Sequence, residues 1–338
     1  MNPIGVGTLD ELVSVVIVSW NGRRLLARCL PKVLTQTYTP LEVIVVDNGS
    51  QDGSADWVEE QFPSVKLVRS ARNLGFAAGT NLGIEVSSGT FIATLNNDAF
   101  ASRTWLEELV RAMGQDEQIG MCSSQMLFAD RPYIINSAGI VVDRVGIAWD
   151  RLGGQTADGH TEVRPVFGAC AGAALYRRAM LDDVGLFDED FFTYLEDVDL
   201  AWRAQWAGWK CVYVPQAIVY HAHSSTAKEG SHFKNRLLGR NKLWTLCKNY
   251  PFPHLLWYAP LIVAYDLMSV TYGIATGRGH GVVQGRIEAL SKVPHTLAKR
   301  QQIVRRVSSR TMMAKLHPLE NPLAILRRYV HIRIAKGR

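Results

Sequence analysis

The sequence predicts an α/β fold with a mostly parallel central sheet. Residues 13–18 (VSVVIV), 41–46 (LEVIVV) and 91–95 (FIATL) are short, largely apolar runs of the kind found in strands buried on both faces. Polar residues follow each run directly. Because the carboxyl ends of parallel strands open onto one crevice, these polar residues are expected to meet there.

The elements between these strands follow a regular alternation. Apolar residues at helical spacing predict a helix over residues 23–34, after the first strand. Beyond the second strand we predict a helix over 55–62, a strand over 65–69, and a Gly/Asn-rich turn over 72–83 that leads into a helix. Strands that alternate with helices in this way indicate parallel pairing with right-handed crossovers.

Composition limits the class of protein. The 338 residues are 47% hydrophobic and 20% charged, which suffices for a sizeable core in one large or two modest domains. The five cysteines show no C-x-x-C spacing, which argues against a zinc site or disulfide framework and favours a reducing compartment. The first residues lack a basic region followed by an apolar core, so no secretory signal is expected.

The most informative stretch is the end of the strand at residues 91–95. Asn96, Asn97 and Asp98 follow it, and three such side chains cannot stay in a strand interior without partners. Alternation along a strand would place Asn96 and Asp98 on one face. Oxygen ligands in that arrangement suit Mg2+ or Mn2+, which would in turn hold a diphosphate. An Asn-rich turn that merely closes the strand is the alternative.

Longer motifs carry a family resemblance. They are VSVVIVSWNG, EVIVVDNGSQDGS, RNLGFAAGTNLG, TLNNDAF, GACAGAALYRR, GLFDEDFFTYLEDVDLAWRAQWAGWK, VYHAHSS and RNKLW. Together they cover about residues 13–245. In these motifs the chain resembles the family 2 glycosyltransferases, inverting nucleotide-sugar-dependent enzymes of GT-A fold, and most of all their bacterial rhamnosyltransferase-like branch. The resemblance implies a GT-A catalytic domain over residues 1–245 and a helical, basic region over 246–338.

The resemblance implies a donor site made from the polar strand ends and the glycine-rich turn. Its residues would be Ser19, Asn21, Asp47, Asn73, Gly75, Asn81 and Asn97. Asp47 would hydrogen-bond the base or ribose. Gly75 and Gly79 permit close backbone approach, and we expect Asn81 at the start of a helix, where amide donors favour anions. Tight packing of a helix on a strand is the alternative role of this turn.

For the metal, the resemblance implies Asp98, Asn96 and His221. The family often has an acid where this chain has Asn96, so only Asp98 supplies negative charge. Neutral imidazole suits Mn2+ as well as softer metals. His223 competes with His221 for this role, and a surface histidine in a loop is the alternative.

The catalytic base is implied to be Asp197, with Glu196 and Asp199 as alternatives within one helical turn. Aromatic residues precede these carboxylates, and an apolar wall raises the pKa of a carboxyl, which helps a base. Without the resemblance, Asp197 would be interpreted as a helix N-cap.

The C-terminal part has a different character. Residues 255–275 are mostly apolar and long enough to span a bilayer, but Pro260 and Asp266 make a spanning helix unfavourable. Residues 277–338 contain fourteen Lys and Arg against two Glu. This combination predicts a helix in the interface of an anionic membrane, with a basic tail that the donor site does not need. A buried hairpin or a dimer contact is the alternative.

We therefore expect an inverting, metal-dependent glycosyltransferase, peripheral on the cytoplasmic face of the membrane. It would move rhamnose or another hexose from a nucleoside-diphosphate sugar to a lipid-linked or polysaccharide acceptor of the cell envelope. A homo-oligomer is allowed, and no nucleic-acid partner is expected. The alternatives are a non-catalytic nucleotide-sugar-binding protein and a nucleotidyltransferase. A processive synthase is disfavoured because no Q-x-x-R-W motif is present.

Overall fold

The structure, a computed structural model, describes residues 11–222 and 230–321. Its first part has the alternation predicted from the sequence: β1 (Val13–Ser19), α1 (Arg23–Leu34), β2 (Leu41–Asp47), α2 (Ser54–Gln61), β3 (Lys66–Arg69), α3 (Gly75–Glu85) and β4 (Phe91–Leu95). β1 pairs in parallel with β2 and β4, and β2 pairs in parallel with β3. The predicted parallel unit is confirmed.

The middle of the chain extends this sheet. Its elements are β5 (Ala99–Ala101), α4 (Trp105–Met113), β6 (Ile119–Phe128), β7 (Arg131–Ser137), β8 (Ile140–Val142), β9 (Ala148–Asp150), β10 (Arg164–Val166), β11 (Ala173–Arg177), α5 (Arg178–Val184), the 3-10 turn η1 (Glu189–Phe191), α6 (Glu196–Ala207) and β12 (Lys210–His221). β11 runs antiparallel between β4 and β6, whereas β12 is parallel to β6. The sheet is therefore mixed, with the order β10-β12-β6-β11-β4-β1-β2-β3.

Helices cover both faces of the sheet and enclose two cores. On one face, α1 and α4 pack against the strands, and Trp105 is fully buried there. On the other face, α3 and α6 do the same around the buried Trp202. This arrangement leaves the carboxyl ends of β1, β2 and β4 together at one edge of the sheet.

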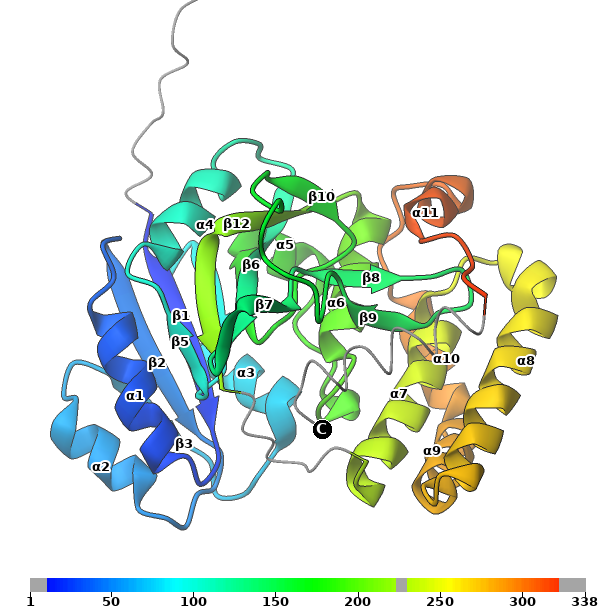
Figure 1. Cartoon of the computed structure of the whole chain (residues 1–338), viewed down its shortest axis with the longest axis horizontal. Helices are drawn as coiled ribbons and strands as arrows, with labels where there is room; N and C mark the ends of the chain where they lie inside the picture. Colours follow the sequence, from blue (N-terminus) through cyan, green and yellow to red (C-terminus); the bar gives the residue numbers. More distant parts are fainter. Residues whose placement is uncertain (1–10, 223–229, 322–338) are drawn as a thin grey trace, which may run out of the picture.

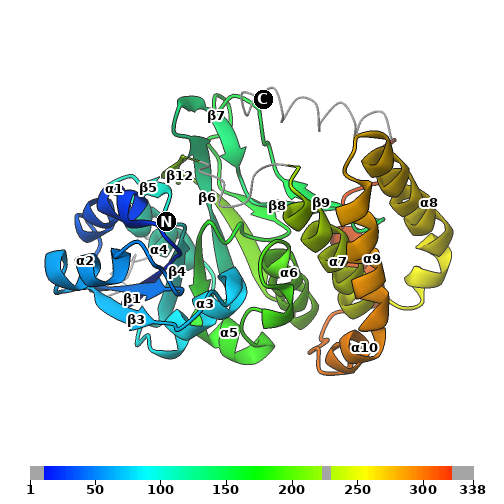
Figure 2. The same cartoon turned by 90° about the horizontal axis from the view of Figure 1, so that it is seen from below.

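The C-terminal helices form a block at one end of the sheet. They are α7 (His232–Asn249), α8 (His254–Ala275), α9 (Gly279–Ser291), α10 (Val293–Gln301) and α11 (Ser309–Lys315). Figures 1 and 2 show α7, α8 and α9 side by side, next to α6 and away from β1–β3. α7 runs across residues 245 and 246, where the sequence analysis divides the chain. Met312 and Met313 of α11 are buried in the same core as Trp206 of α6, so these helices share a core with the sheet.

α8 presents an apolar face to the outside. Trp257 is 82% exposed, and Leu256 and Leu267 are also exposed. Asp266 lies on the opposite side, where it forms ion pairs with Lys242 of α7 and Arg286 of α9. Within the described residues, α8 is the one helix that is long and apolar enough to cross a membrane, and 6% of its most apolar window is buried.

Candidate active site

The polar residues at the ends of β1, β2 and β4 do converge. The Asn97 side-chain amide donates to Ser19 Oγ over 2.9 Å, which joins the end of β4 to the end of β1. The backbone N–H of Asn21 donates to Ser50 Oγ at 2.9 Å, which joins the turns after β1 and β2. Asp47 is buried at the end of β2, where it accepts from the backbone N–H of Ser50 at 3.2 Å.

The glycine-rich turn brings α3 against a segment more than a hundred residues away. Gly75 has φ +86°, and a Cβ there would lie 2.4 Å from the carbonyl oxygen of Phe192. Only glycine therefore permits this approach. Asn73 supports the turn, since its Oδ1 accepts from the backbone N–H of Gly75 at 2.9 Å and from Asn48 Nδ2 at 3.2 Å.

The expectation that Asn81 stands at the start of a helix is wrong. α3 already begins at Gly75, so Asn81 lies within the helix and offers no free backbone donors to an anion. Its side chain contacts the segment before the acidic pair Glu196–Asp197. Nδ2 donates to Phe187 O at 2.9 Å and to Glu189 Oε1 at 3.0 Å, and Oδ1 accepts from the backbone N–H of Phe187 at 3.1 Å. These contacts hold that segment against α3.

The three polar residues after β4 lie in a turn and not in the strand. β4 ends at Leu95, and Ala99 N–H donates to Asn96 O at 3.0 Å to close the turn before β5. Strand alternation therefore does not relate Asn96 to Asp98, contrary to the sequence argument. Asn96 lines the cavity described below, whereas Asp98 is buried and contacts His221.

His221 is held between two oxygen atoms. Its Nε2 lies 3.0 Å from Asp98 Oδ1, and its Nδ1 lies 2.9 Å from Asn136 Oδ1. Antiparallel pairing of β5 with β12 sets Ala99 opposite His221 and so brings the ring to Asp98. His223, the competing candidate, lies outside the described residues. Within residues 11–222 and 230–321, no cluster of three or more His, Cys, Asp or Glu forms a complete metal site.

A cavity of about 350 Å³ opens beside these residues. Asn96, Glu196, Asp197 and His221 line it, which brings four of the predicted site residues to one space. It also has lining residues that the sequence analysis did not select: Asn136, Trp149, Asp150, Thr193, Tyr194 and Lys234. They come from β7, β9, α7 and the segment before α6. Thr193 and Tyr194 lie within the quoted motif over residues 185–210. No motif marks Asn136, Trp149, Asp150 or Lys234, and antiparallel strand pairing brings the first three of these here.

Asp197 sits in the first turn of α6 on the wall of this cavity. Its Oδ2 accepts from the Ala171 backbone N–H at 3.2 Å, and the N-cap position belongs to Leu195, so Asp197 is not the N-cap. Its pKa is raised to about 6, chiefly by burial and in addition by the charge of Asp150, while the hydrogen bond from Ala171 opposes the rise. A carboxylate with this pKa is ionised at neutral pH and basic enough to accept a proton.

Glu196, the neighbour of Asp197, is in a different state. It is buried, and its Oε2 has no hydrogen-bond partner among the described residues. Burial, together with the charge of Asp197, raises the pKa of Glu196 well above its usual range. This favours a neutral carboxylic acid, which can donate a hydrogen bond into the cavity. The two neighbouring acids are thereby suited to opposite roles.

Asp199, the remaining alternative for the base, belongs to a buried ion network. Its carboxylate accepts from Arg203 Nε, Lys248 Nζ and Asn249 Nδ2, each at 2.8 Å. Burial alone would raise its pKa, but the charges of Lys248 and Arg203 outweigh burial and hold the pKa well below its usual range. So weak a base, away from the cavity lining, does not fit proton abstraction.

The mixed sheet, with polar strand ends and an acidic pair beside one cavity, is that of a GT-A glycosyltransferase. The model of the family described as "Glycosyl transferase family 2" matches residues 14–185, about half of the chain. The chain belongs to this family.

Among curated proteins, the chain is similar to N-acetylglucosaminyl-diphospho-decaprenol L-rhamnosyltransferase of Mycobacterium tuberculosis, with 30% identity over 66% of this chain and 81% of that protein. It is 28% identical to the O-antigen biosynthesis protein RfbC of Myxococcus xanthus, over 64% of this chain and 18% of that protein.

Two solved structures share the fold. GalNAc-T7 with UDP, GalNAc and Mn2+ has a TM-score of 0.65 at 17% identity, covering 90% of this chain and 56% of that one. The mannosyltransferase PcManGT of Pyrobaculum calidifontis, with GDP-Man and Mn2+, has a TM-score of 0.53 at 18% identity, covering 90% of this chain and 86% of that one.

Proposed function

We propose that this glycosyltransferase is an inverting, divalent-metal-dependent enzyme. It transfers a hexose, with rhamnose as the first candidate, from a nucleoside-diphosphate sugar to a lipid-linked or polysaccharide acceptor in cell-envelope synthesis. The observation that carries the proposal is Asp197, a carboxylate with a raised pKa on the wall of a cavity that Asn96 and His221 also line. The similarity to a mycobacterial rhamnosyltransferase supports the sugar and the acceptor class.

The donor would lie across the converged strand ends. Ser19, Asn21, Asp47 and Asn97 offer hydroxyl, amide and carboxylate groups there, which suits a nucleoside and its diphosphate. Asn73 and Gly75 shape the turn beside them, and Asn81 acts through the segment that it holds.

Asp98 and His221 are suited to hold the metal. If Nδ1–H of the imidazole donates to Asn136 Oδ1, the lone pair of Nε2 faces a carboxylate oxygen at 3.0 Å. Two lone pairs at this distance repel unless a proton or a cation lies between them, and such an oriented imidazole is typical of metal ligands. Asn96, diphosphate oxygens and water would complete the shell. Mg2+ or Mn2+ held there would neutralise the departing diphosphate.

Asp197 would act as the base of a single displacement. Its carboxylate accepts the proton of the acceptor hydroxyl while that oxygen forms a bond to the anomeric carbon. The bond from this carbon to the diphosphate oxygen breaks on the opposite side, and the anomeric configuration is inverted. Glu196, as a neutral acid, would donate a hydrogen bond to a sugar hydroxyl in the cavity.

The enzyme would work on the cytoplasmic face of the membrane, held there by the apolar face of α8. That face carries Trp257, Leu256 and Leu267, and Asp266 does not oppose it because it is paired on the inner side. An exposed apolar helix with basic residues next to it in the chain would lie against the lipid surface. Part of the basic charge predicted to meet anionic lipids is used internally, since Arg286 and Lys299 form ion pairs within the protein.

A donor screen tests the proposal. Hydrolysis and transfer are measured with UDP-, dTDP- and GDP-sugars in the presence of Mg2+ or Mn2+, and chelation should abolish both activities. NMR of the product should show inversion. A protein that binds one of these donors but neither hydrolyses nor transfers it would be the non-catalytic binding protein instead. Retention of configuration would exclude the single displacement.

A further inference from the structure

The segment that leads into the acidic pair has a strained backbone. We call residues 188–195 the base loop, because Glu196 and Asp197 follow it directly. Within it, Phe192, Tyr194 and Leu195 have φ values of +63°, +70° and +65°, in the left-handed region that non-glycine residues rarely occupy. Such a backbone persists only where its surroundings determine it strongly, and it occurs most often at functional sites.

One buried side chain of α7 holds this backbone. Asn241 is completely buried, and its Nδ2 donates to the carbonyl oxygens of Phe191, Thr193 and Tyr194 at 3.0, 3.0 and 2.7 Å. The preceding residue, Arg240, donates to the carbonyl oxygen of Phe191 at 3.0 Å and to the Oδ1 of Asn241 at 2.9 Å. The carbonyl groups that the left-handed residues turn inward are thereby satisfied by α7.

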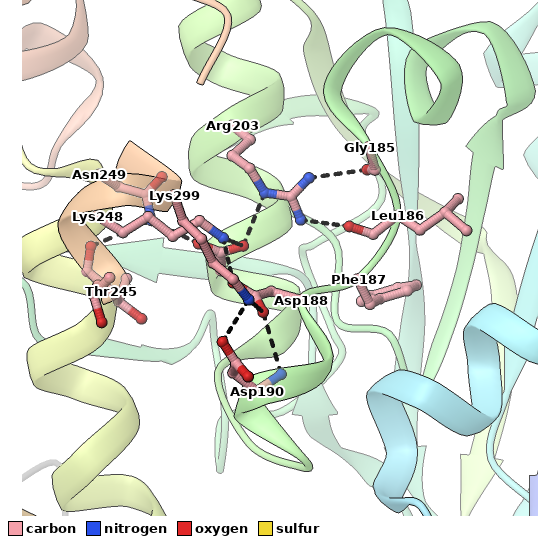
Figure 3. A network of polar contacts seen from close by, with 12 residues as sticks. Gly185, Leu186, Phe187, Asp188, Asp190, Arg203, Thr245, Lys248, Asn249 and Lys299 are labelled. Carbon is pink, nitrogen blue, oxygen red and sulfur yellow. Dashed lines mark hydrogen bonds and ion pairs between the residues drawn. The ribbon is translucent and has the colours of Figure 1, made fainter. Parts of the chain in front are cut away.

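The start of the base loop is held by cations from two C-terminal helices. Asp188 pairs with Lys248 of α7 at 2.7 Å and with Lys299 of α10 at 2.5 Å, and Lys299 also pairs with Asp190 (Figure 3). Lys248 in turn pairs with Asp199 of α6 at 2.8 Å. Figure 3 shows these charges packed between α6, α7 and α10. The network ties both ends of the segment that carries Asp197 to the C-terminal block.

We propose that Asn241 and Lys299 are positioning residues for Asp197: they hold the base loop in its strained conformation and so set the carboxylate on the cavity wall. This inference rests on the proposed role of Asp197 as the base. It also revises the expectation that the C-terminal part is dispensable for the site. α10 lies within residues 277–338, and removing it would take away Lys299.

Lys299 gives the sharper test because it is partly exposed and can be exchanged without opening the core. Lys299→Met should lower kcat roughly ten- to a hundredfold, the scale of a base misplaced by about 1 Å, with donor KM nearly unchanged. Lys299→Arg keeps the charge and should restore most of the rate. The matched control is Arg306→Met, which removes a neighbouring C-terminal cation that pairs with Asp183 away from the base loop.

Hydrogen exchange supplies a measurement that does not depend on activity. Peptides covering residues 188–197 should exchange faster in Lys299→Met than in the wild type, and at the wild-type rate in Arg306→Met. Asn241→Ala should show the larger effect if it folds, and Lys299→Met decides the matter if it does not. Unchanged kcat and exchange in Lys299→Met, or equal losses in Lys299→Met, Lys299→Arg and Arg306→Met, would overturn the proposal.

The two proposals fail in different ways. A wild-type protein that transfers no sugar from any donor would contradict the proposed function, while the exchange data would still report whether Lys299 orders the loop. An active wild type with a normally protected and normally active Lys299→Met would leave the function standing and remove the positioning role.

Discussion

Nε2 of His221 lies 3.0 Å from Oδ1 of Asp98, although 123 positions separate the two residues in the chain. The contact exists because β12 pairs with β5, the short strand that follows the turn bearing Asp98. Both side chains are buried, and Asn136 holds the far side of the imidazole ring. The pair therefore has a fixed geometry before any ligand binds.

The first prediction concerns this pair. Asp98→Asn should remove nearly all transfer and leave the fold intact, because the amide cannot supply the negative charge that a hard cation requires. Calorimetric titration with Mn2+ should show weaker metal binding by Asp98→Asn than by the wild type, and the circular dichroism spectra of the two proteins should be the same. Near-wild-type turnover of this variant at saturating donor would rule out Asp98 as a ligand.

The second prediction concerns Asp197, the proposed base. Asp197→Asn should bind donor normally but transfer at least roughly a hundredfold more slowly, the scale of lost general-base catalysis. Glu196→Gln keeps a hydrogen-bond donor at its position and should lose less. Steady-state kinetics and donor binding separate these effects. An inactive Glu196→Gln beside an active Asp197→Asn would exchange the two roles.

The third prediction is a pH profile. A base must be ionised, and the pKa of Asp197 is raised to about 6, chiefly by burial and in addition by Asp150. The rate of transfer should therefore rise with pH through about 6 and then level off. Asp150→Asn removes a negative charge, lowers the pKa of Asp197 and should move this limb to lower pH. If the rise in rate stayed at the same pH in Asp150→Asn, the group that titrates there would not be Asp197.

The fourth prediction concerns stability. Asp199→Asn would leave the buried cations Arg203 and Lys248 without their shared partner, and should lower the free energy of unfolding at pH 7 by about 3–5 kcal/mol. The pKa of Asp199 is depressed in the folded state. Its stabilisation is therefore present above the unfolded pKa, roughly 4, and is lost progressively as pH falls from there through the depressed pKa of the folded state.

Urea denaturation at pH 7 checks the size of this effect. Asp56→Asn is the control, because Asp56 forms a surface pair with Arg69 and should cost less than about 1 kcal/mol. Equal losses in the two variants would show that the buried network contributes no more than an exposed ion pair.

The fifth prediction concerns the apolar face of α8. Trp257→Glu with Leu267→Glu should reduce cosedimentation with anionic vesicles while donor hydrolysis is retained, because neither side chain lines the cavity. Salt should weaken binding of the wild type but not abolish it. Tyr133→Glu alters another exposed aromatic residue, which lies in β7 away from α8, and should have no effect. A wild type that stays in the supernatant at low salt would contradict membrane association.

Local sequence patterns predicted the parallel half of the fold well. The strand at residues 91–95 and the helix at 23–34 have the predicted bounds, because buried strands and amphipathic helices have distinct periodicities. Contacts between residues far apart in the chain could not be predicted from these patterns. Asn136 and Asp150 reach the cavity through antiparallel pairing of short strands, and Asn241 acts on carbonyl groups about fifty residues away. No spacing along the chain encodes such contacts.

The continuity of α7 matters for anyone who builds hybrid enzymes from this family. Its eighteen residues include Lys234, which lines the cavity, and Lys248, which forms ion pairs with Asp188 and Asp199. A crossover placed near residue 245 would cut this helix, and its two parts would then come from different proteins whose contacts do not match. Exchange of acceptor-specific parts should therefore join chains before α7 and carry the helix, its neighbours and the base loop as one unit.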